Sequence, residues 1–375
     1  MNYKYSFTLG EWLYYIFFTL LTIGKAIGLN ANNKILQLMT ILAFIMLLIK
    51  LLITQYTKRE IIICVILITI GVMSYLSSGR EGVILTIVTI IGLKNISYKR
   101  ILYLTFIIRS FIFTSLITLS LSGIIENVTV NHWRDGVGIV NRYGLGYDHP
   151  NLLHTNLFIL VILFIYIFYE KLNIACYIGI LTINLLIYNF SVSRTGLFAI
   201  ILAVLITVLL KRKLISNRVF YDICKIVIPL CVLFTIITAF GYKKFDLIKK
   251  IDRIFSGRIY YSSYFLSSYK WNAFGRNLVG DNNLLDNGYV VLIINYGIII
   301  FGLYILGYHK IVKRFIAYNM NKELLMIILF SIYGVTEGYI PNIFLNLSLI
   351  FLSSIIFMKN NAFLINNKNR NGEQN

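Results

Sequence analysis

The sequence predicts an all-α, polytopic integral membrane protein, and three observations indicate this class. Of the 375 residues, 58% are hydrophobic, and the mean hydropathy is +0.78. Only 13% are charged, whereas charged residues make up about 25% of an average soluble domain. Apolar runs of about 17–25 residues, long enough for a helix to cross a bilayer, recur along the whole chain. We therefore expect a bundle of membrane-spanning helices.

About twelve helices follow from these apolar runs. We expect them at 11–29, 34–54, 61–78, 82–94, 101–122, 151–169, 173–190, 195–210, 222–241, 287–308, 323–338 and 342–358. The fourth is short enough to be a half-span. No Pro-, Gly- or Ser-rich linker and no internal repeat divides the chain. This predicts a single integral domain over residues 1–375, with two larger extracytoplasmic loops at about 123–150 and 242–286.

The orientation follows from the distribution of basic residues. Lys and Arg gather in alternate connections, around residues 50–59, 94–100, 211–218 and 310–322. The positive-inside rule places such connections in the cytoplasm, so we expect both termini there. Basic residues near the inner leaflet are an orientation signal. The net charge of +20 therefore requires no nucleic-acid partner.

The predicted outer loop 242–286 is basic beyond what orientation requires. It holds eight Lys or Arg residues against four Asp residues, and an outward basic surface suits an anionic ligand. Within this loop, "KKFDLIKKIDRIF" (243–255) has the spacing of an amphipathic helix lying in the headgroup layer. The aromatic-rich "RIYYSSYFLSSYKW" (258–271) is typical of an interfacial Tyr/Trp belt.

Four polar clusters recur on the predicted outer side. They are "SGREG" (78–82), "RYGLGYDHPN" (142–151), "SVSRTG" (191–196), and the stretch from "SGRIYY" (256–261) to "NAFGRNLVGDNNLLDNGYVVLIINYG" (272–297). Arginines at a membrane boundary are costly unless they are paired or solvated, so several on one side indicate a shared cavity. Two alternatives stay open: Arg80, beside Glu81, is a snorkelling residue, and His149 merely caps the helix after Pro150.

The order and spacing of these motifs resemble the Wzy-type oligosaccharide repeat-unit polymerases of bacterial capsule, exopolysaccharide and O-antigen pathways. The resemblance includes "GREGVILTIVTIIGLKN" and "SLSGIIENVT" and covers most of residues 75–305. It implies a type C glycosyltransferase-like protein of the bacterial cytoplasmic membrane. It also implies metal-independent, inverting glycosyl transfer on the outer leaflet, without a cofactor. The donor would be a glycan on undecaprenyl pyrophosphate, and the acceptor a second lipid-linked repeat unit. Flippase and chain-length regulator proteins would be further partners.

The resemblance also implies roles for individual residues. Arg194 and Arg258, and after them Arg142, are candidates for clamping the departing pyrophosphate, because a guanidinium matches phosphate oxygens in bidentate geometry. A general base must take the proton of the acceptor hydroxyl. Related O-antigen ligases carry His-Asn where this chain has Asp286-Asn287, so the base is Asp286 or His149, with Asp286 preferred. The further substrate-binding candidates, with no metal ligand among them, are Asn151, Asn287, Arg276 and Arg80.

Other functions are compatible with the same sequence. A glycan ligase would use the same chemistry with another acceptor. A lipid-linked oligosaccharide flippase or exporter would also have about twelve helices, although transporters often show repeated halves, and none is evident here. A scaffold would not require arginines at several helix mouths. Arg109, in the middle of the predicted helix 101–122, fits none of these functions: either it pairs with a carboxylate, or the helix is two shorter pieces.

Overall fold

The computed structural model describes residues 7–29, 33–134, 138–278 and 285–357. These residues are mostly helical, with one two-stranded sheet. The chain folds as two compact units, each built from two separate stretches of sequence. Unit 1 comprises Met1–Thr54 and Ile96–Arg212, and unit 2 comprises Gln55–Asn95 and Lys213–Asn375. The prediction of one integral domain stays a prediction, and each unit is treated by itself below.

Seven helices in the described part of the chain are long and apolar enough to cross a membrane, judged by length and composition. They are Lys34–Ile53, Lys58–Ser78, Tyr98–Leu121, Pro150–Lys171, Ile174–Ser191, Arg194–Lys211 and Asn217–Gly241. Most of their residues are not buried within the protein, with the exception of Pro150–Lys171, and apolar side chains exposed in this way suit contact with lipid. The chain is therefore an all-α, multi-pass membrane protein. The predicted number of about twelve spans is not confirmed.

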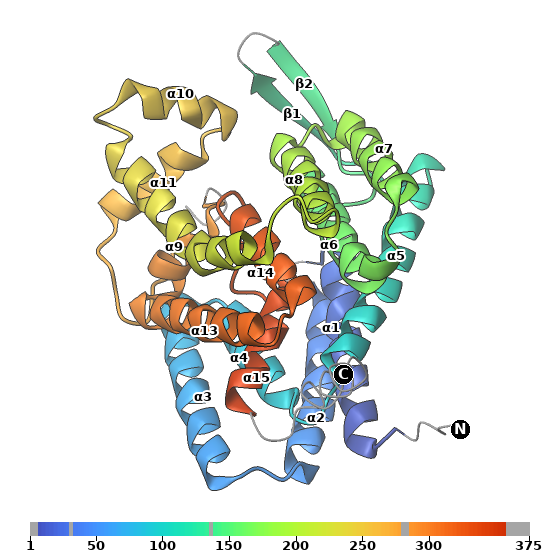
Figure 1. Cartoon of the computed structure of the whole chain (residues 1–375), viewed down its shortest axis with the longest axis vertical. Coiled ribbons are helices and arrows are strands. Elements are labelled where there is room, and N and C mark those ends of the chain that lie inside the picture. Colours follow the sequence, from blue (N-terminus) through green and yellow to red (C-terminus); the bar gives the residue numbers. More distant parts are fainter. Residues whose placement is uncertain (1–6, 30–32, 135–137, 279–284, 358–375) are drawn as a thin grey trace. The chain divides into compact units, whose positions relative to one another are not determined.

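Unit 1 is a helical bundle around one central helix (Figure 1). Its helices are α1 (Leu9–Ile27), α2 (Lys34–Ile53), α5 (Tyr98–Leu121), α6 (Pro150–Phe168) with the 3₁₀ turn η1 (Tyr169–Lys171), α7 (Ile174–Ser191) and α8 (Arg194–Lys211). Helix α1 packs on α2 and α5, while α6 packs on α5, α7 and α8. Residues 153–163 of α6 are all buried. Helix α6 is thus enclosed by protein, as expected for a helix that is apolar on every side.

A β-hairpin precedes α6. Strands β1 (Thr129–Arg134) and β2 (Gly138–Tyr143) pair antiparallel, with Thr129 opposite Tyr143 and Trp133 opposite Ile139. The hairpin was not expected, since residues 123–150 were predicted only as a loop. Its connecting residues 135–137 lie outside the described residues. Alternation along β2 leaves Asn141 exposed and buries Arg142. The hairpin therefore turns Arg142 toward the protein.

Arg109 lies inside an uninterrupted helix, so the alternative of two shorter pieces is wrong. Helix α5 runs from Tyr98 to Leu121 without a break. Arg109 is buried, and its Nη1 donates a hydrogen bond to Oδ1 of Asn156 on α6. Asn156 in turn donates to the carbonyl of Leu152, at 2.9 Å. The Asn156 amide of the neighbouring helix thus accepts a hydrogen bond from Arg109. This contact offsets part of the free-energy cost of placing a guanidinium in a membrane.

Unit 2 contains the remaining elements. They are α3 (Lys58–Ser78), α4 (Gly82–Gly92), α9 (Asn217–Gly241), α10 (Asp246–Ile254), α11 (Arg258–Ser268), α12 (Gly288–Val291), the π-helical η2 (Leu292–Tyr296), α13 (Ile298–Ala317), α14 (Asn321–Tyr333), the 3₁₀ helix η3 (Leu347–Leu352) and α15 (Ser353–Ile356). Helix α9 packs on α11, α13 and α14, and α3 packs on α4. The predicted loop 242–286 thus contains two helices, and its residues 279–284 lie outside the described residues.

The predicted continuous helix 287–308 is wrong, because the chain breaks within it. The short α12 continues into η2, and Gly297, with φ of 91°, separates η2 from α13. Beyond the break, the N–H of Ile298 donates to the carbonyl of Asn272 at 2.9 Å. A Cβ on Gly297 would lie 2.6 Å from the carbonyl carbon of Ala273. Backbone-to-backbone packing at a glycine therefore replaces the helical hydrogen bonds, which an apolar pattern cannot reveal.

The predicted helix 342–358 is also wrong over its first part. Turns occupy the stretch between α14 and η3, from about 334 to 346, and most of its residues are buried. Asn346 holds this stretch in place, since its Nδ2 donates to the carbonyl of Ile340 at 3.0 Å. Non-helical backbone at membrane depth is tolerated where protein buries it or where it lines a cavity. This buried segment carries residues of the candidate site described below.

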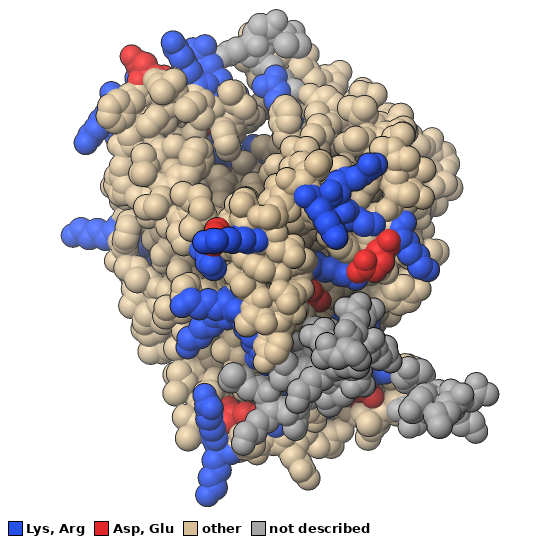
Figure 2. Space-filling view, in the orientation of Figure 1, with Lys and Arg blue, Asp and Glu red and all other residues tan. Residues whose placement is uncertain are grey.

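The amphipathic helix expected at 243–255 is present as α10. Ile248 is buried against the unit, whereas Leu247 and Ile254 are 68% and 61% exposed. Figure 2 shows basic side chains projecting where α10 lies, at the upper left. Exposed apolar residues beside exposed lysines are typical of a helix at a membrane interface. Its place in the headgroup layer stays a prediction.

Candidate functional site

The candidate site in unit 2 is built at the start of α11. Gly257 precedes the helix in the left-handed region, with φ of 84°. The buried carboxylate of Asp252 accepts hydrogen bonds from the N–H groups of Ile259 (2.8 Å) and Tyr260 (3.2 Å). Burial raises the pKa of Asp252 from its ordinary value, and these two backbone bonds oppose that rise. This cap fixes the first turn of α11 and with it Arg258, the first residue of the helix.

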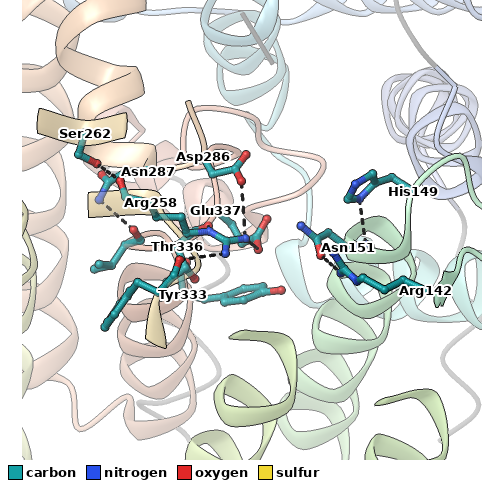
Figure 3. Close-up of polar contacts among 12 residues, drawn as sticks. Arg142, His149, Asn151, Arg258, Ser262, Asp286, Asn287, Tyr333, Thr336 and Glu337 are labelled. Carbon is teal, nitrogen blue, oxygen red and sulfur yellow. Dashed lines mark hydrogen bonds and ion pairs between the residues drawn. The ribbon is translucent and has the colours of Figure 1, made fainter. Parts of the chain in front are cut away.

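Arg258 lies between two carboxylates (Figure 3). Its Nη2 is 3.2 Å from Glu337 Oε1 and 3.6 Å from Asp286 Oδ2. Its Nε donates to the carbonyl of Thr336 at 2.6 Å, and Nη1 donates to the carbonyl of Phe255 at 3.4 Å. Four protein acceptors therefore surround one guanidinium, which leaves few of its five N–H groups for a ligand. Counted formally, two carboxylates and one guanidinium carry one net negative charge.

The two carboxylates differ in their exposure. The Asp286 side chain is 47% exposed, whereas that of Glu337 is 11% exposed. Asp286 can therefore reach a ligand, while Glu337 is held behind it within the protein. Only Asp286 was expected from the sequence. A signal for Glu337 was present in "GVTEGYIPN" (334–342), where a carboxylate, two glycines and a proline interrupt two apolar runs.

Asn287 has a structural role in the arrangement. It caps α12, since its Oδ1 accepts from the N–H groups of Tyr289 (3.0 Å) and Val290 (3.1 Å). Its Nδ2 donates to Thr235 Oγ1 on α9 (3.2 Å) and to the carbonyl of Val335 (2.8 Å). Asn287 thus ties α9, α12 and the buried turn segment together beside Asp286. Its predicted role in substrate binding stays a prediction.

The second group of predicted residues lies in unit 1, at the start of α6 (Figure 3). The buried Arg142 donates from Nη2 to Asn151 Oδ1 and from Nε to the carbonyl of Ser191, at 2.8 Å. His149 is the N-cap of α6, and its Nδ1 accepts from the N–H of Asn151 at 3.1 Å. The capping role of His149 is confirmed. Whether it also acts as a base stays a prediction.

The glycines of "RYGLGYDHPN" are explained by this turn. Gly146 has φ of 86°, and a Cβ there would lie 2.8 Å from the carbonyl oxygen of Leu116 on α5. A Cβ on Gly144 would collide with the carbonyl of Tyr147. Only glycine fits both positions, so Tyr147 can pack against Phe113, with ring centroids 6.3 Å apart. The stretch is therefore a turn that packs against α5 and leads directly into α6.

Arg194 is the first residue of α8 and is half-buried. Among the residues that the structure describes, its guanidinium makes no hydrogen bond or ion pair, in contrast to Arg142 and Arg258. The motifs of Arg142 and Arg194 meet at Ser191, whose carbonyl accepts from Arg142 three positions before Arg194. This connection could not be predicted from the sequence, because Ser191 lies 49 positions after Arg142.

Arg80 and Arg276 have their own sets of contacts in unit 2. With the Asn295 amide oxygen turned toward it, the Arg80 guanidinium donates to that oxygen from Nε at 2.7 Å. Arg276 donates to the carbonyl of Lys270 at 2.7 Å and lies 5.7 Å from the ring centre of Tyr269. Both side chains are thus held by residues other than those around Arg258. Their substrate-binding roles stay predictions.

Apart from Arg80 and Arg276, the structure brings the predicted residues together as two local groups, one in each unit. Arg142, His149, Asn151 and the Arg194 turn belong to unit 1, and Arg258, Asp286 and Asn287 to unit 2. The single cavity shared by Arg194 and Arg258 stays a prediction. In the described part of the chain, no three His, Cys, Asp or Glu side chains cluster as metal ligands. Metal independence likewise stays a prediction.

Compared with protein-family models, with curated proteins and with solved structures, the chain matches none of them. The resemblance to Wzy-type polymerases therefore depends on the order and spacing of the motifs quoted above.

Proposed function

We propose that this protein is a membrane glycosyltransferase that polymerises undecaprenyl-pyrophosphate-linked oligosaccharide repeat units, as Wzy-type polymerases do. Three observations support the proposal together. The chain is a multi-pass helical membrane protein, it carries the ordered motifs of that family, and the last of these motifs places the Asp286 carboxylate 3.6 Å from the Arg258 guanidinium. The reaction would be a metal-independent, inverting glycosyl transfer.

The observation that carries the proposal is the half-exposed carboxylate of Asp286 held beside the buried guanidinium of Arg258. In the transfer, the acceptor hydroxyl oxygen bonds to the anomeric carbon of the donor sugar, and its proton passes to Asp286. General-base catalysis of this kind contributes about 10²–10⁴ in rate. The contacts of Arg258 favour a role in holding Asp286 in place over the predicted role as a pyrophosphate clamp. The net negative charge of the cluster suits an uncharged hydroxyl better than a diphosphate.

The pyrophosphate then requires guanidinium groups elsewhere, and Arg194 is the leading candidate. As the bond from the anomeric carbon to the phosphate oxygen breaks, its electron pair leaves with undecaprenyl pyrophosphate. A guanidinium whose donors are not already occupied by protein can stabilise that charge in bidentate geometry. Arg142, engaged with Asn151 and the carbonyl of Ser191, would orient Asn151 toward the substrate. His149, Asn287, Arg80 and Arg276 complete the proposed set.

The finer topology belongs to the same proposal. We propose about twelve spans, both termini in the cytoplasm, and extracytoplasmic segments at about 123–150 and 242–286, in a bacterial cytoplasmic membrane. The distribution of Lys and Arg supports this orientation. The basic helix α10 (Asp246–Ile254) would then face the outer leaflet, where it suits anionic lipid. Flippase and chain-length regulator proteins are proposed partners.

One observation favours the second candidate, a flippase or exporter of lipid-linked oligosaccharides. Secondary transporters commonly use helices interrupted near the bilayer midplane, and unit 2 contains such a break at Gly297, between η2 and α13. A glycan ligase with the same chemistry differs from the polymerase only in its acceptor.

Incubation of the purified protein with a defined lipid-linked repeat unit and excess EDTA distinguishes these functions. A ladder of products that differ by one repeat unit supports the polymerase, and transfer to an added foreign acceptor without a ladder supports the ligase. Substrate that stays chemically unchanged but moves between leaflets of proteoliposomes supports the flippase. The Asp286→Asn variant is the control for chemistry, because it removes the proposed base and keeps the shape of the side chain. A ladder of wild-type yield from this variant would exclude Asp286 as the base.

A further inference from the structure

A buried hydrogen-bond network lies beneath the turn that precedes Arg194. His154 on α6 is fully buried, and its ring nitrogens contact Ser191 Oγ (Nδ1, 2.9 Å) and Asn184 Oδ1 (Nε2, 2.8 Å). Asn184 Nδ2 donates to the carbonyl of Leu197 at 3.1 Å, which turns its oxygen toward the ring. Nε2 of His154 therefore carries the hydrogen, and Nδ1 accepts from the Ser191 hydroxyl. This tautomer is assigned from the network of donors and acceptors.

The same ring supports the first turn of α8. A Cβ on Gly196 would lie 2.6 Å from Cγ of His154 and closer still to Cδ2. The ring thus fills the space where any other residue at 196 would place its side chain. Helix α8 can start at this position because residue 196 is glycine. The imidazole therefore contacts Ser191 in the turn and Gly196 in the helix, which come before and after Arg194 in the chain.

The turn itself is strained. Val192 has φ of 46° and ψ of 33°, a left-handed conformation that is a genuine outlier for a β-branched residue. Such strain persists only where the surroundings determine the conformation. Here the surroundings are the hydrogen bond from Val192 N–H to the Tyr188 carbonyl (2.7 Å) and that from Ser193 N–H to Ser191 Oγ (3.3 Å). The second bond depends on Ser191, which His154 holds.

Ser191, His154 and Asn184 have the residue types of a nucleophile, a base and an orienting amide. All three side chains are 0% exposed, so none of them can touch a substrate. Ser191 also fixes Arg142 through its carbonyl. We propose that His154 is a positioning residue that locks the strained turn Ser191–Ser193 and thereby sets the direction of the Arg194 guanidinium. The link to pyrophosphate binding rests on the proposed function, but the lock itself does not.

A thiol reporter at Arg194 tests the lock without any assay of activity. The four native cysteines are replaced by alanine, Arg194→Cys is introduced, and the rate of its reaction with a maleimide is measured in detergent-purified protein. A second reporter, Ser122→Cys at the exposed end of α5, reports on unit 1 as a whole. We expect His154→Ala to raise the Arg194→Cys rate about tenfold or more, since release of a strained turn changes the population of the open form by that order. The Ser122→Cys rate should not change. Equal rates with and without His154, or a rise at both reporters, would overturn the proposal.

A second variant guards against misfolding of His154→Ala. Gly196→Ala keeps all three hydrogen-bonding side chains and adds one methyl group against the ring, whereas Gly179→Ala on α7 adds one with nothing within 4 Å. Only Gly196→Ala should raise the Arg194→Cys rate, and the same rate in both glycine variants would contradict the lock.

The repeat-unit assay then tests the functional link. If His154 acts through Arg194, His154→Ala should reduce turnover strongly in the wild-type background and by less than about threefold in an Arg194→Ala background. Equal losses in both backgrounds would show that His154 does not act through Arg194. Absence of a ladder from the wild-type protein would sink the proposed function and leave the reporter result standing.

Discussion

Replacing Arg258 by alanine removes the cation that lies against the buried carboxylate of Glu337. The two side chains are 9% and 11% exposed, with Nη2 and Oε1 3.2 Å apart. Breaking a buried ion pair by removing one partner costs about 3–5 kcal/mol, because a buried charge loses its compensation. The double variant Arg258→Ala/Glu337→Ala removes that charge as well. We therefore expect the double variant to be more stable than Arg258→Ala alone.

By the same reasoning, replacing Asp286 should affect turnover strongly and stability little. Its side chain is 47% exposed and 3.6 Å from Arg258 Nη2, so Asp286→Asn should lower the free energy of unfolding by less than about 1 kcal/mol. If Asp286 is the base, turnover should fall by about 10²–10⁴. Both quantities are measured on detergent-purified protein, as the urea unfolding midpoint and as the rate of ladder formation. Asp246→Asn on α10, whose carboxylate is 87% exposed, is the matched control and should change neither.

Two results would refute this division of roles. If Arg258→Ala unfolds at the wild-type urea concentration, Glu337 does not depend on Arg258 for its charge compensation. If Asp286→Asn loses stability as Arg258→Ala does but keeps its turnover, the exposed carboxylate is structural, and the base lies elsewhere.

Three further predictions follow from local geometry. Gly146→Ala should lower the thermal unfolding midpoint of the protein more than Gly123→Ala does. Both glycines have positive φ, so both variants share a left-handed strain of about 1–2 kcal/mol. Only at Gly146 would the added Cβ lie 2.8 Å from a carbonyl oxygen. Burial raises the pKa of the Asp252 carboxyl from 3.8, so the folded state binds the carboxyl proton more tightly than the unfolded state does. The stability from this proton is present below about pH 4 and is lost as the pH rises through the raised pKa. Over that range, urea unfolding should show the wild type losing stability relative to Asp252→Asn, and an equal pH dependence of the two proteins would contradict this. Arg194→Lys keeps the charge and removes the fork, so ladder formation should fall about 10²-fold, while Arg218→Lys at the exposed start of α9 should leave it unchanged.

The helices that the sequence predicted best are those whose stabilisation is local or lipid-facing. Helix α2 was expected at 34–54 and lies at Lys34–Ile53, and α7 was expected at 173–190 and lies at Ile174–Ser191. A long apolar run has no other way to satisfy its backbone in a membrane, so length and composition suffice. Helix α10 followed from its amphipathic spacing for a similarly local reason.

The errors lie where backbone packs on backbone. The break at Gly297 and the buried turns between α14 and η3 follow apolar runs that look like helices. They form because carbonyl and N–H groups of distant segments replace the helical partners, as Asn272 does for Ile298. An apolar sequence pattern does not predict such hydrogen-bond partners. Glu337 was missed for this reason, since it fell at the end of the predicted helix 323–338, whereas α14 ends at Tyr333.

The sequence by itself determined that the chain is a multi-pass helical membrane protein and where its polar residues gather. Both depend on hydropathy and charge, which are properties of each residue. Only the tertiary structure decided which polar groups meet: Arg258 with Glu337 and Asp286, Arg142 with Ser191, and His154 beneath Gly196. These contacts join positions up to 79 residues apart. They arise because a buried polar group must find a partner wherever the fold supplies one, and that choice belongs to packing rather than to local sequence.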